Sequence, residues 1–156
     1  MSDLVDLPVR ELIALMTSNQ TSSEEICAAF LTRISESASI NAVVHTDADG
    51  VLRQARIADS QRRIGDTDPL LGIPFSVKDS IAVAGWPWRS GSHARAEVIA
   101  TKDATTVARL RAQGAIVLCK TTTPEYTWSA QTNSDLHGRT NNPYDLDRSS
   151  GGSSGG

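Results

Sequence analysis

The chain has 156 residues, of which 39% are hydrophobic and 21% are charged, and its formal net charge is −3. This composition excludes a disordered chain, and the length favours one domain with a sizeable core. Fifteen basic and eighteen acidic residues provide no general field for attracting nucleic acid or an anionic membrane. No run approaches the ~18 apolar residues of a membrane helix, and residues 1–6 do not resemble a signal peptide, so we expect a cytoplasmic protein.

The first third of the chain is predicted to be helical. Apolar residues recur at helical spacing after Pro8, which a first helical turn tolerates. Thr21 and Glu24 are a candidate capping box for a second helix, because a hydroxyl and a carboxylate three residues apart can bind each other's backbone amides. A short strand is expected over residues 41–45 and an amphipathic helix over residues 48–63.

The pattern changes from Leu70 onward. Residues 73–77 and 115–119 are short apolar runs, typical of strands buried on both faces. Between them, a helix is expected to begin near Asp103 and to end at Gly114, which suits the position after a helix C-terminus. A strand, a helix and a second strand in this order form an α/β unit and favour parallel pairing of the strands.

Beyond Lys120 the predicted regular structure fades. Residues 121–156 are rich in Thr, Ser, Asn and Gly, and only a short helix after Pro124 is expected. A stretch of this length without regular structure usually serves a function or indicates a truncated domain.

The cysteines and histidines do not suggest a metal site. Cys27 and Cys119 lie in apolar segments and are expected to be buried, reduced thiols. The histidines share no ligand spacing, and each is expected on the surface or in a loop: His45, His93 and His137. The sequence implies no cofactor.

Lys78 has two interpretations. It ends an apolar run, so it could extend its amine into solvent as many strand-end lysines do. If it is buried instead, desolvation lowers the pKa of the amine, and a neutral amine can act as a general base.

A glycine- and serine-rich run, residues 151–156, follows 75 positions after Lys78 when counted to Ser153. Taken alone, the run suits a flexible linker or a phosphate-binding loop, although no Gly-Lys-Ser/Thr follows it. With a buried lysine, a serine in such a turn suits a hydrolase that works without histidine.

Several motifs occur together in one order, and with them the chain resembles the amidase signature family over residues 70–156 and more loosely before. The motifs are Gly72–Asp79, Gly91-Ser92, Asp103–Ala115, Lys120-Thr121, Pro124–Tyr126, Gly138–Thr140, Asn142–Asp145 and Gly151–Gly156. The resemblance implies an α/β fold with a mixed sheet flanked by helices. It also implies that residues 1–156 are the N-terminal part of a single amidase domain, with a helical segment over 1–65 and the start of the α/β core over 70–156.

The resemblance also implies site residues. The family hydrolyses amides with a Ser-Ser-Lys triad, in which Lys78 would be the base and Ser153 the bridging serine at a cis peptide bond. Ser154, Gly151 and Gly152 would support them. Substrate contacts are expected at Thr123 and Ser129.

The family's nucleophilic serine follows in a downstream turn that this chain does not contain. We therefore expect a truncated fragment, inactive by itself, of a hydrolase that acts on C–N bonds other than peptide bonds. The expected partners are a small-molecule amide and a second copy in a homodimer, with no direct contact to nucleic acid or membrane.

Two alternative functions remain open at this point. The chain could belong to the A subunit of a glutamyl/aspartyl-tRNA amidotransferase, or it could be a non-catalytic, truncated binding module. Amidotransferase A subunits tend to have Met-Asp-Glu-Phe where this chain has Thr123-Pro124-Glu125-Tyr126, a form more similar to stand-alone amidases. Trp86, Trp88 and Trp128 either line an acyl pocket or simply fill space in the fold.

Overall fold

The structure is a computed structural model that describes residues 4–156. Residues 1–3, part of the segment tested for a signal peptide, lie outside the described residues. The chain divides into two compact units. The first comprises residues 4–36, 47–75 and 109–118, and the second comprises residues 37–46, 76–108 and 119–156.

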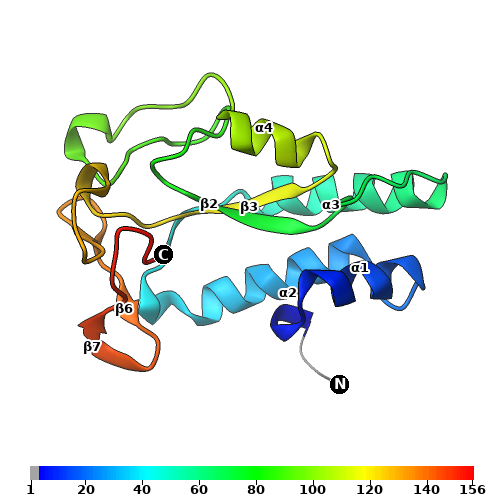
Figure 1. Cartoon of the computed structure of the whole chain (residues 1–156), viewed down its shortest axis with the longest axis horizontal. Coiled ribbons are helices and arrows are strands. Elements are labelled where there is room, and N and C mark those ends of the chain that lie inside the picture. Colours follow the sequence, from blue (N-terminus) through cyan, green and yellow to red (C-terminus); the bar gives the residue numbers. More distant parts are fainter. Residues whose placement is uncertain (1–3) are drawn as a thin grey trace. The chain divides into compact units, whose positions relative to one another are not determined.

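The described residues form an α/β fold (Figure 1). The helices are η1 (Leu4–Asp6), α1 (Val9–Thr17), α2 (Ser23–Glu36), η2 (Ala38–Ile40), α3 (Ala48–Arg63), η3 (His93–Arg95), α4 (Thr105–Arg111) and η4 (Glu125–Thr127). The strands are β1 (Val43–His45), β2 (Pro74–Lys78), β3 (Ile116–Thr121), β4 (Asn133–Ser134), β5 (Gly138–Arg139), β6 (Asn141–Asn142) and β7 (Asp145–Ser149). Within residues 4–156, no helix is long and apolar enough to span a bilayer.

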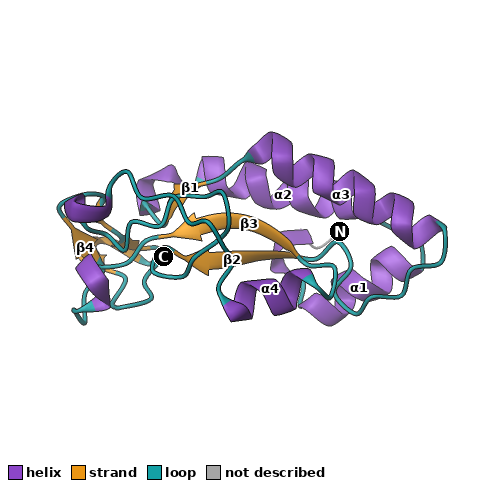
Figure 2. Cartoon of the chain, turned by 90° about the horizontal axis from the view of Figure 1, so that it is seen from above, coloured by secondary structure: helices purple, strands orange, loops and turns teal. Residues whose placement is uncertain are grey.

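The predicted N-terminal helices form the first unit. Helices α2 and α3 lie side by side (Figure 2), as their amphipathic patterns require. A core cluster forms where α1 and α2 bury their apolar stripes, and it contains Leu12, Met16, Ile26 and Ile73. This packing stabilises α1, whose nine residues would form only a marginally stable helix in isolation.

The capping box of α2 lies one residue later than predicted. Ser22 is the capping hydroxyl: its Oγ accepts from the Glu25 amide at 3.1 Å, and the Glu25 carboxylate accepts from the Ser22 amide at 2.9 Å. This amide and the Thr21 and Ser22 hydroxyls lower the pKa of Glu25. Glu24, the predicted partner, instead pairs with Arg56 on α3 at 2.7 Å. The contact with α3 therefore engages the carboxylate that the sequence had assigned to the cap.

The main sheet is mixed, with the strand order β1-β3-β2. Strand β1 pairs with β3 in antiparallel orientation. The predicted parallel pairing of the two apolar runs is confirmed, because the Ile116 amide donates to Ile73 and the Asp79 amide donates to Thr121, each at 2.9 Å.

The two apolar runs differ in burial. Every residue of β3 is buried, as predicted, because β3 is the central strand. For β2 the prediction of burial on both faces is wrong: Val77 is buried, but Ser76 is exposed. Because β2 is an edge strand in this sheet, part of its surface stays accessible.

Helix α4 is shorter than the predicted segment at both ends. The helix begins at Thr105 rather than near Asp103, whose carboxylate accepts from the Ala84 amide at 2.7 Å. Gly114 lies beyond the helix end with a φ of 83°, a conformation that glycine adopts without strain. A Cβ at Gly114 would also stand 2.7 Å from the Leu71 Cα. The glycine thus permits both the turn and the close approach.

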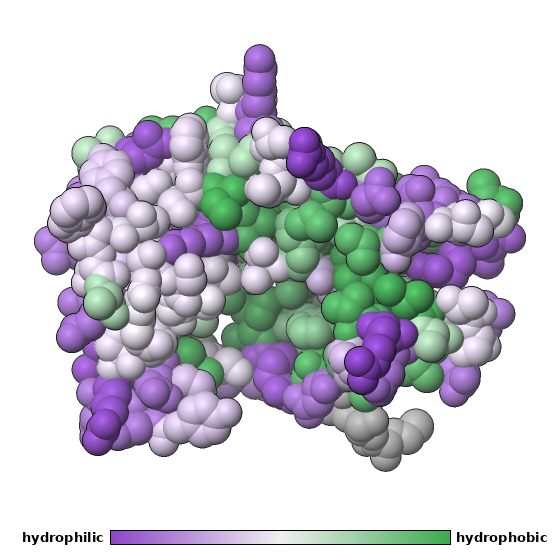
Figure 3. All heavy atoms as spheres, viewed as in Figure 1, coloured by the Kyte–Doolittle hydropathy of each residue, from purple (hydrophilic) through white to green (hydrophobic). Residues whose placement is uncertain are grey.

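The C-terminal third has more regular structure than predicted. Strands β4 and β5 form one antiparallel pair, and β6 and β7 form another. The short helix after Pro124 is present as η4. In Figure 3 the region of β6, β7 and the C-terminus is largely hydrophilic. Short polar strands of this kind depend on backbone pairing, so apolar periodicity does not reveal them.

Both cysteines are free and buried, as predicted. Burial raises the pKa of the Cys27 thiol to about 12 and that of the Cys119 thiol to about 11.

Replacing Ile26 by Ala is expected to lower the free energy of unfolding by about 2–5 kcal/mol, because it leaves a cavity in the α1–α2 core. The same change at Ile57 is the matched control, since Ile26 is 0% exposed and Ile57 is 58% exposed. Urea denaturation measures both. Equal losses in the two variants would contradict the assigned core.

The buried thiols predict a loss of stability at alkaline pH. A thiol in the unfolded chain ionises near pH 9.0, whereas the native thiols keep their protons up to about pH 11–12. Their contribution is therefore complete below pH 9 and is lost as the pH rises through this window. The free energy of unfolding should fall less steeply with pH in a Cys27→Ala/Cys119→Ala variant than in the parent. Parallel slopes would show that the thiols ionise equally in both states.

Candidate active site

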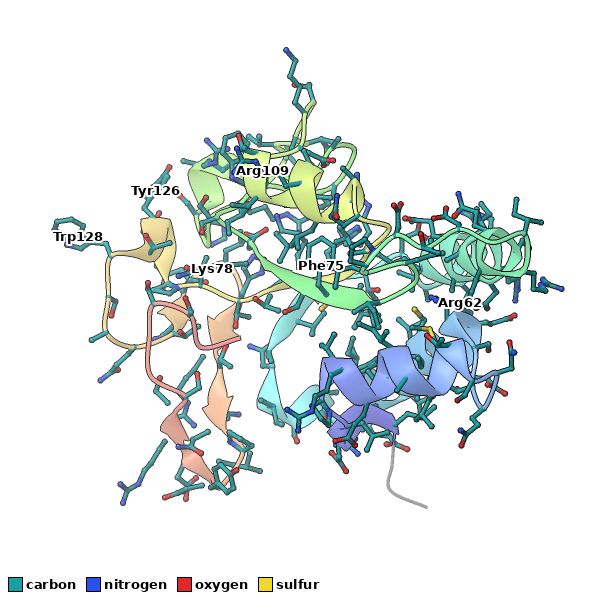
Figure 4. The ribbon with its side chains drawn as sticks, turned by 45° about the vertical axis from the view of Figure 1, so that its right-hand side comes forward. Arg62, Phe75, Lys78, Arg109, Tyr126 and Trp128 are labelled. Atoms are coloured by element: carbon teal, nitrogen blue, oxygen red, sulfur yellow. The ribbon has the colours of Figure 1, made fainter. Side chains whose placement is uncertain are left out.

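Lys78 and the glycine–serine run meet in the second unit. Lys78 Nζ lies 2.9 Å from Ser153 Oγ and 3.0 Å from Ser154 Oγ. Figure 4 shows Lys78 at the end of β2. The fold thus joins two segments separated by 75 positions in a direct hydrogen bond.

The amine of Lys78 is partly buried, between the two environments that the sequence left open. Burial lowers its pKa, which increases the fraction of neutral amine. The peptide group that follows Lys78 is held in place: the Ile81 amide donates to the Lys78 carbonyl at 2.8 Å, and the Asp79 amide donates to the Thr121 carbonyl at 2.9 Å. A lysine in this setting can receive a proton from a neighbouring hydroxyl.

The glycine–serine run is an ordered turn rather than a flexible linker. The peptide bond between Gly152 and Ser153 is cis. A Cβ at Gly152 would stand 2.9 Å from main-chain carbons of Ala130 and Gln131, and one at Gly156 would stand 2.4 Å from the Thr122 nitrogen. The run therefore lies so close to neighbouring backbone that side chains at these positions would not fit.

The two expected substrate contacts lie in different surroundings. Thr123 is 1% exposed, and its hydroxyl donates to the carbonyls of Pro124 at 3.1 Å and Ser153 at 3.3 Å. Ser129 is exposed, and its hydroxyl accepts from the Gln131 amide at 3.1 Å. The structure thus brings Thr123 into contact with Ser153, whereas Ser129 remains on the surface.

The tryptophans do not share one pocket wall. Trp128 is 91% exposed, and Figure 4 shows it pointing away from the ribbon. Trp86 meets His45 edge-on, with ring centroids 4.9 Å apart. Trp88 donates to the Ser80 carbonyl at 2.9 Å and lines a cavity of about 670 Å³ between residues 80–82 and 100–106.

The histidines occupy three different settings. His93 is exposed, as predicted, whereas His45 lies half-buried in strand β1, so the prediction of a surface or loop position is wrong for His45. His137 lies in the turn between β4 and β5, which confirms the prediction of a surface or loop position, although its side chain is mostly buried. Burial lowers the pKa of His137, and nearby Asp79 opposes this effect.

One buried pair was missed by the sequence analysis. Asp79 and Lys120 are both 0% exposed, and Lys120 Nζ lies 3.7 Å from Asp79 Oδ1. The signal was present in the sequence: Lys120 directly continues a fully buried apolar run, and a lysine in such a place needs partners.

The comparison with known families agrees with this geometry. Residues 25–156 match the family described as Amidase. The chain belongs to this family. It is 37% identical over 148 residues to the A subunit of glutamyl-tRNA(Gln) amidotransferase from Cupriavidus necator. The aligned region covers 95% of the chain and 30% of that protein. The corresponding protein of Salinispora tropica is 39% identical over 158 residues, which covers 100% of the chain and 32% of that protein.

Solved structures show the same relationship. The native peptide amidase of Stenotrophomonas maltophilia is 34% identical, with a TM-score of 0.88 over 96% of this chain and 32% of its own. A bacterial aryl acylamidase of the amidase signature family is 27% identical, with a TM-score of 0.88 over the same shares. These values confirm the amidase signature fold. The chain spans about a third of the length of these relatives.

Lys78 is expected to titrate below the ordinary lysine value of 10.5 in the folded chain and at that value in urea, because unfolding removes its burial. A base whose pKa is lowered by folding adds stability as the pH rises through the folded and then the unfolded pKa. The Nζ signals of a ¹⁵N-lysine-labelled chain can be followed by NMR, since the lysines are only Lys78, Lys102 and Lys120.

Lys78→Met assigns the signal by its disappearance. Identical titration of Lys78 in the folded and urea-unfolded chain would contradict the partly buried position.

Proposed function

We propose that this chain is part of an amidase that cleaves carboxylic amides by acyl transfer, with Lys78 as the base and Ser153 as the bridging serine. The observation that carries the proposal is the 2.9 Å separation of Lys78 Nζ and Ser153 Oγ. The Lys78 pKa, which burial lowers, supports the role of proton acceptor.

In the proposed reaction, neutral Lys78 accepts the proton of the Ser153 hydroxyl while Ser153 accepts the proton of a nucleophilic serine. The oxygen of that serine bonds to the amide carbon, and backbone amides stabilise the resulting oxyanion. The C–N bond then breaks, and the proton returns through Ser153 to the departing amine. Water cleaves the acyl-enzyme by the same proton route in reverse. We assign the nucleophile to the two thirds of the relatives' length that this chain does not span.

The supporting roles follow from the contacts around Ser153. Ser154 Oγ accepts a second hydrogen bond from Lys78, which fixes the direction of the amine. Gly151, with a φ of 89°, and Gly152, against the backbone of residues 130–131, shape the turn. Ser129 is accessible to a substrate, and Thr123 borders the Ser153 main chain. We propose both as substrate contacts.

The proposed substrate class is the carboxylic amide in general. Peptide amidase and aryl acylamidase are both among the structural neighbours, so a restriction to bonds other than peptide bonds has no support.

A second candidate is the A subunit of a tRNA-dependent amidotransferase. The sequence relatives with 37–39% identity carry that name, so they support the second candidate as well as the structural neighbours support the first. In that case the same Lys78–Ser153 chemistry would release ammonia from a donor amide, and activity would depend on further subunits. Hydrolysis of simple amides without partner subunits favours the first candidate, and activity that appears only with them favours the second.

A chimera tests the proposed chemistry directly. Residues 1–156 replace the matching third of the S. maltophilia peptide amidase, and hydrolysis of a peptide amide is measured. We expect measurable turnover, and Lys78→Ala in the chimera should reduce kcat by about 10³-fold or more, as for other members of catalytic triads.

Lys102→Ala is the matched control, because Lys102 is an exposed lysine in the same unit and should leave kcat unchanged. The unmodified 156-residue chain is expected to show no turnover above its own Lys78→Ala variant. A folded chimera in which Lys78→Ala keeps full activity would refute the assignment of the base.

A further inference from the structure

We propose that the buried pair Asp79–Lys120 is a positioning device that holds Lys78 and Ser153 within hydrogen-bonding distance. The catalytic consequence of this inference rests on the proposed function, whereas the geometry it describes belongs to the chain itself. Neither residue touches the reacting atoms, so both are positioning residues.

Lys120 ties together three segments. Its Nζ lies 3.7 Å from Asp79 Oδ1 and donates to the carbonyls of Ile81 at 2.6 Å and Pro87 at 3.2 Å. The amine thus joins the end of β3 to the turn after Lys78 and to the loop beyond it. Desolvation lowers the pKa of Lys120, and the carboxylate of Asp79 opposes this effect.

Asp79 contacts the same loop through its carboxylate. Its Oδ1 lies 3.5 Å from the Arg89 amide nitrogen, and its Oδ2 lies 3.4 Å from that of Gly91 and 3.9 Å from His137 Nε2. The two carboxylate oxygens therefore face backbone N–H groups at two positions of the loop. Only a side chain with two acceptor atoms can satisfy both N–H groups.

The network reaches both members of the proposed dyad. Asp79 follows Lys78 directly, and the Ile81 segment that Lys120 holds also donates to the Lys78 carbonyl. On the other side, a Cβ at Gly91 would stand 2.6 Å from the Thr123 carbonyl oxygen, so the loop lies directly against Thr123. The Thr123 hydroxyl in turn donates to the Ser153 carbonyl.

Stability alone does not account for such a pair. Two fully buried charges lose their hydration, and apolar residues of similar size often stabilise a protein equally well. What apolar residues cannot do is accept two backbone amides and donate to two carbonyls. The pair therefore specifies the geometry of the loops around Lys78 rather than merely filling the interior.

Asp79→Asn tests the inference, since the amide keeps the shape but replaces one acceptor oxygen with a donor. In the ¹⁵N-lysine-labelled chain, the Lys78 pKa should rise toward its ordinary value as the amine moves into solvent. The Arg89 and Gly91 amides should exchange with deuterium roughly threefold to tenfold faster, as expected for the loss of one hydrogen bond. The Ala100 amide, bonded to the Trp86 carbonyl, serves as the internal reference.

A second variant and a control keep the test decisive. Asp79→Asn/Lys120→Met removes both buried charges and should fold even if the single variant does not; it should also raise the Lys78 pKa. Val107→Ala, a cavity in helix α4 of the same chain, controls for general loosening and should leave the Lys78 titration unchanged.

Unchanged titration of Lys78 in a folded Asp79 variant would overturn the inference. So would the loss of folding in both Asp79 variants while Val107→Ala folds, because the pair would then serve the stability of the whole unit. None of these measurements uses catalysis. An inactive chimera with a shifted Lys78 titration would refute the proposed function and leave the positioning role intact.

Discussion

The hydrogen bond between Lys78 Nζ and Ser153 Oγ is the contact on which the candidate active site depends. It connects the end of a sheet strand to a turn of glycines and serines far along the chain. Neither group is unusual by itself, because strand-end lysines and glycine-rich turns are common. A partly buried amine within hydrogen-bonding distance of a serine hydroxyl differs from both, because burial lowers the pKa of the amine and increases its neutral fraction.

Two lysines at the ends of neighbouring strands show how burial separates their roles. Lys78 ends the edge strand β2 and is partly exposed, and its amine reaches the Ser153 hydroxyl. Lys120 lies in the central strand β3, fully buried, and its hydrogen bonds all go to the protein interior. The same side chain is suited to chemistry in one place and to positioning in the other because strand order decides which one solvent can reach.

Membership of the amidase family is shown by the match over residues 25–156. The relatives include amidotransferase subunits as well as peptide and aryl amidases. The residues common to the proposed chemistry, Lys78 and Ser153, are held by backbone contacts and by buried polar groups. Residues that would distinguish substrates, such as Ser129, lie on the surface, where the surroundings impose less constraint.

The sequence by itself determined helices α1, α2 and α3 and the two strands of the apolar runs, and its resemblance to a known family pointed to Lys78 and Ser153 as a candidate dyad. Apolar spacing indicates which face of a helix is buried, and several motifs in one order identify a family more reliably than any single motif. Helices α1, α2 and α3 and the parallel pairing of β2 with β3 followed from such patterns.

Only the tertiary structure decided that Ser22 and Glu25 form the capping box of α2, which apolar strand lies at the edge of the sheet, and that the polar segments β4 to β7 pair as strands. It also decided that Asp79 and Lys120 meet, each fully buried and each the charged partner of the other. These features depend on contacts between residues distant in the chain. A local sequence pattern does not specify which distant group will pair with a buried charge or accept from a backbone amide.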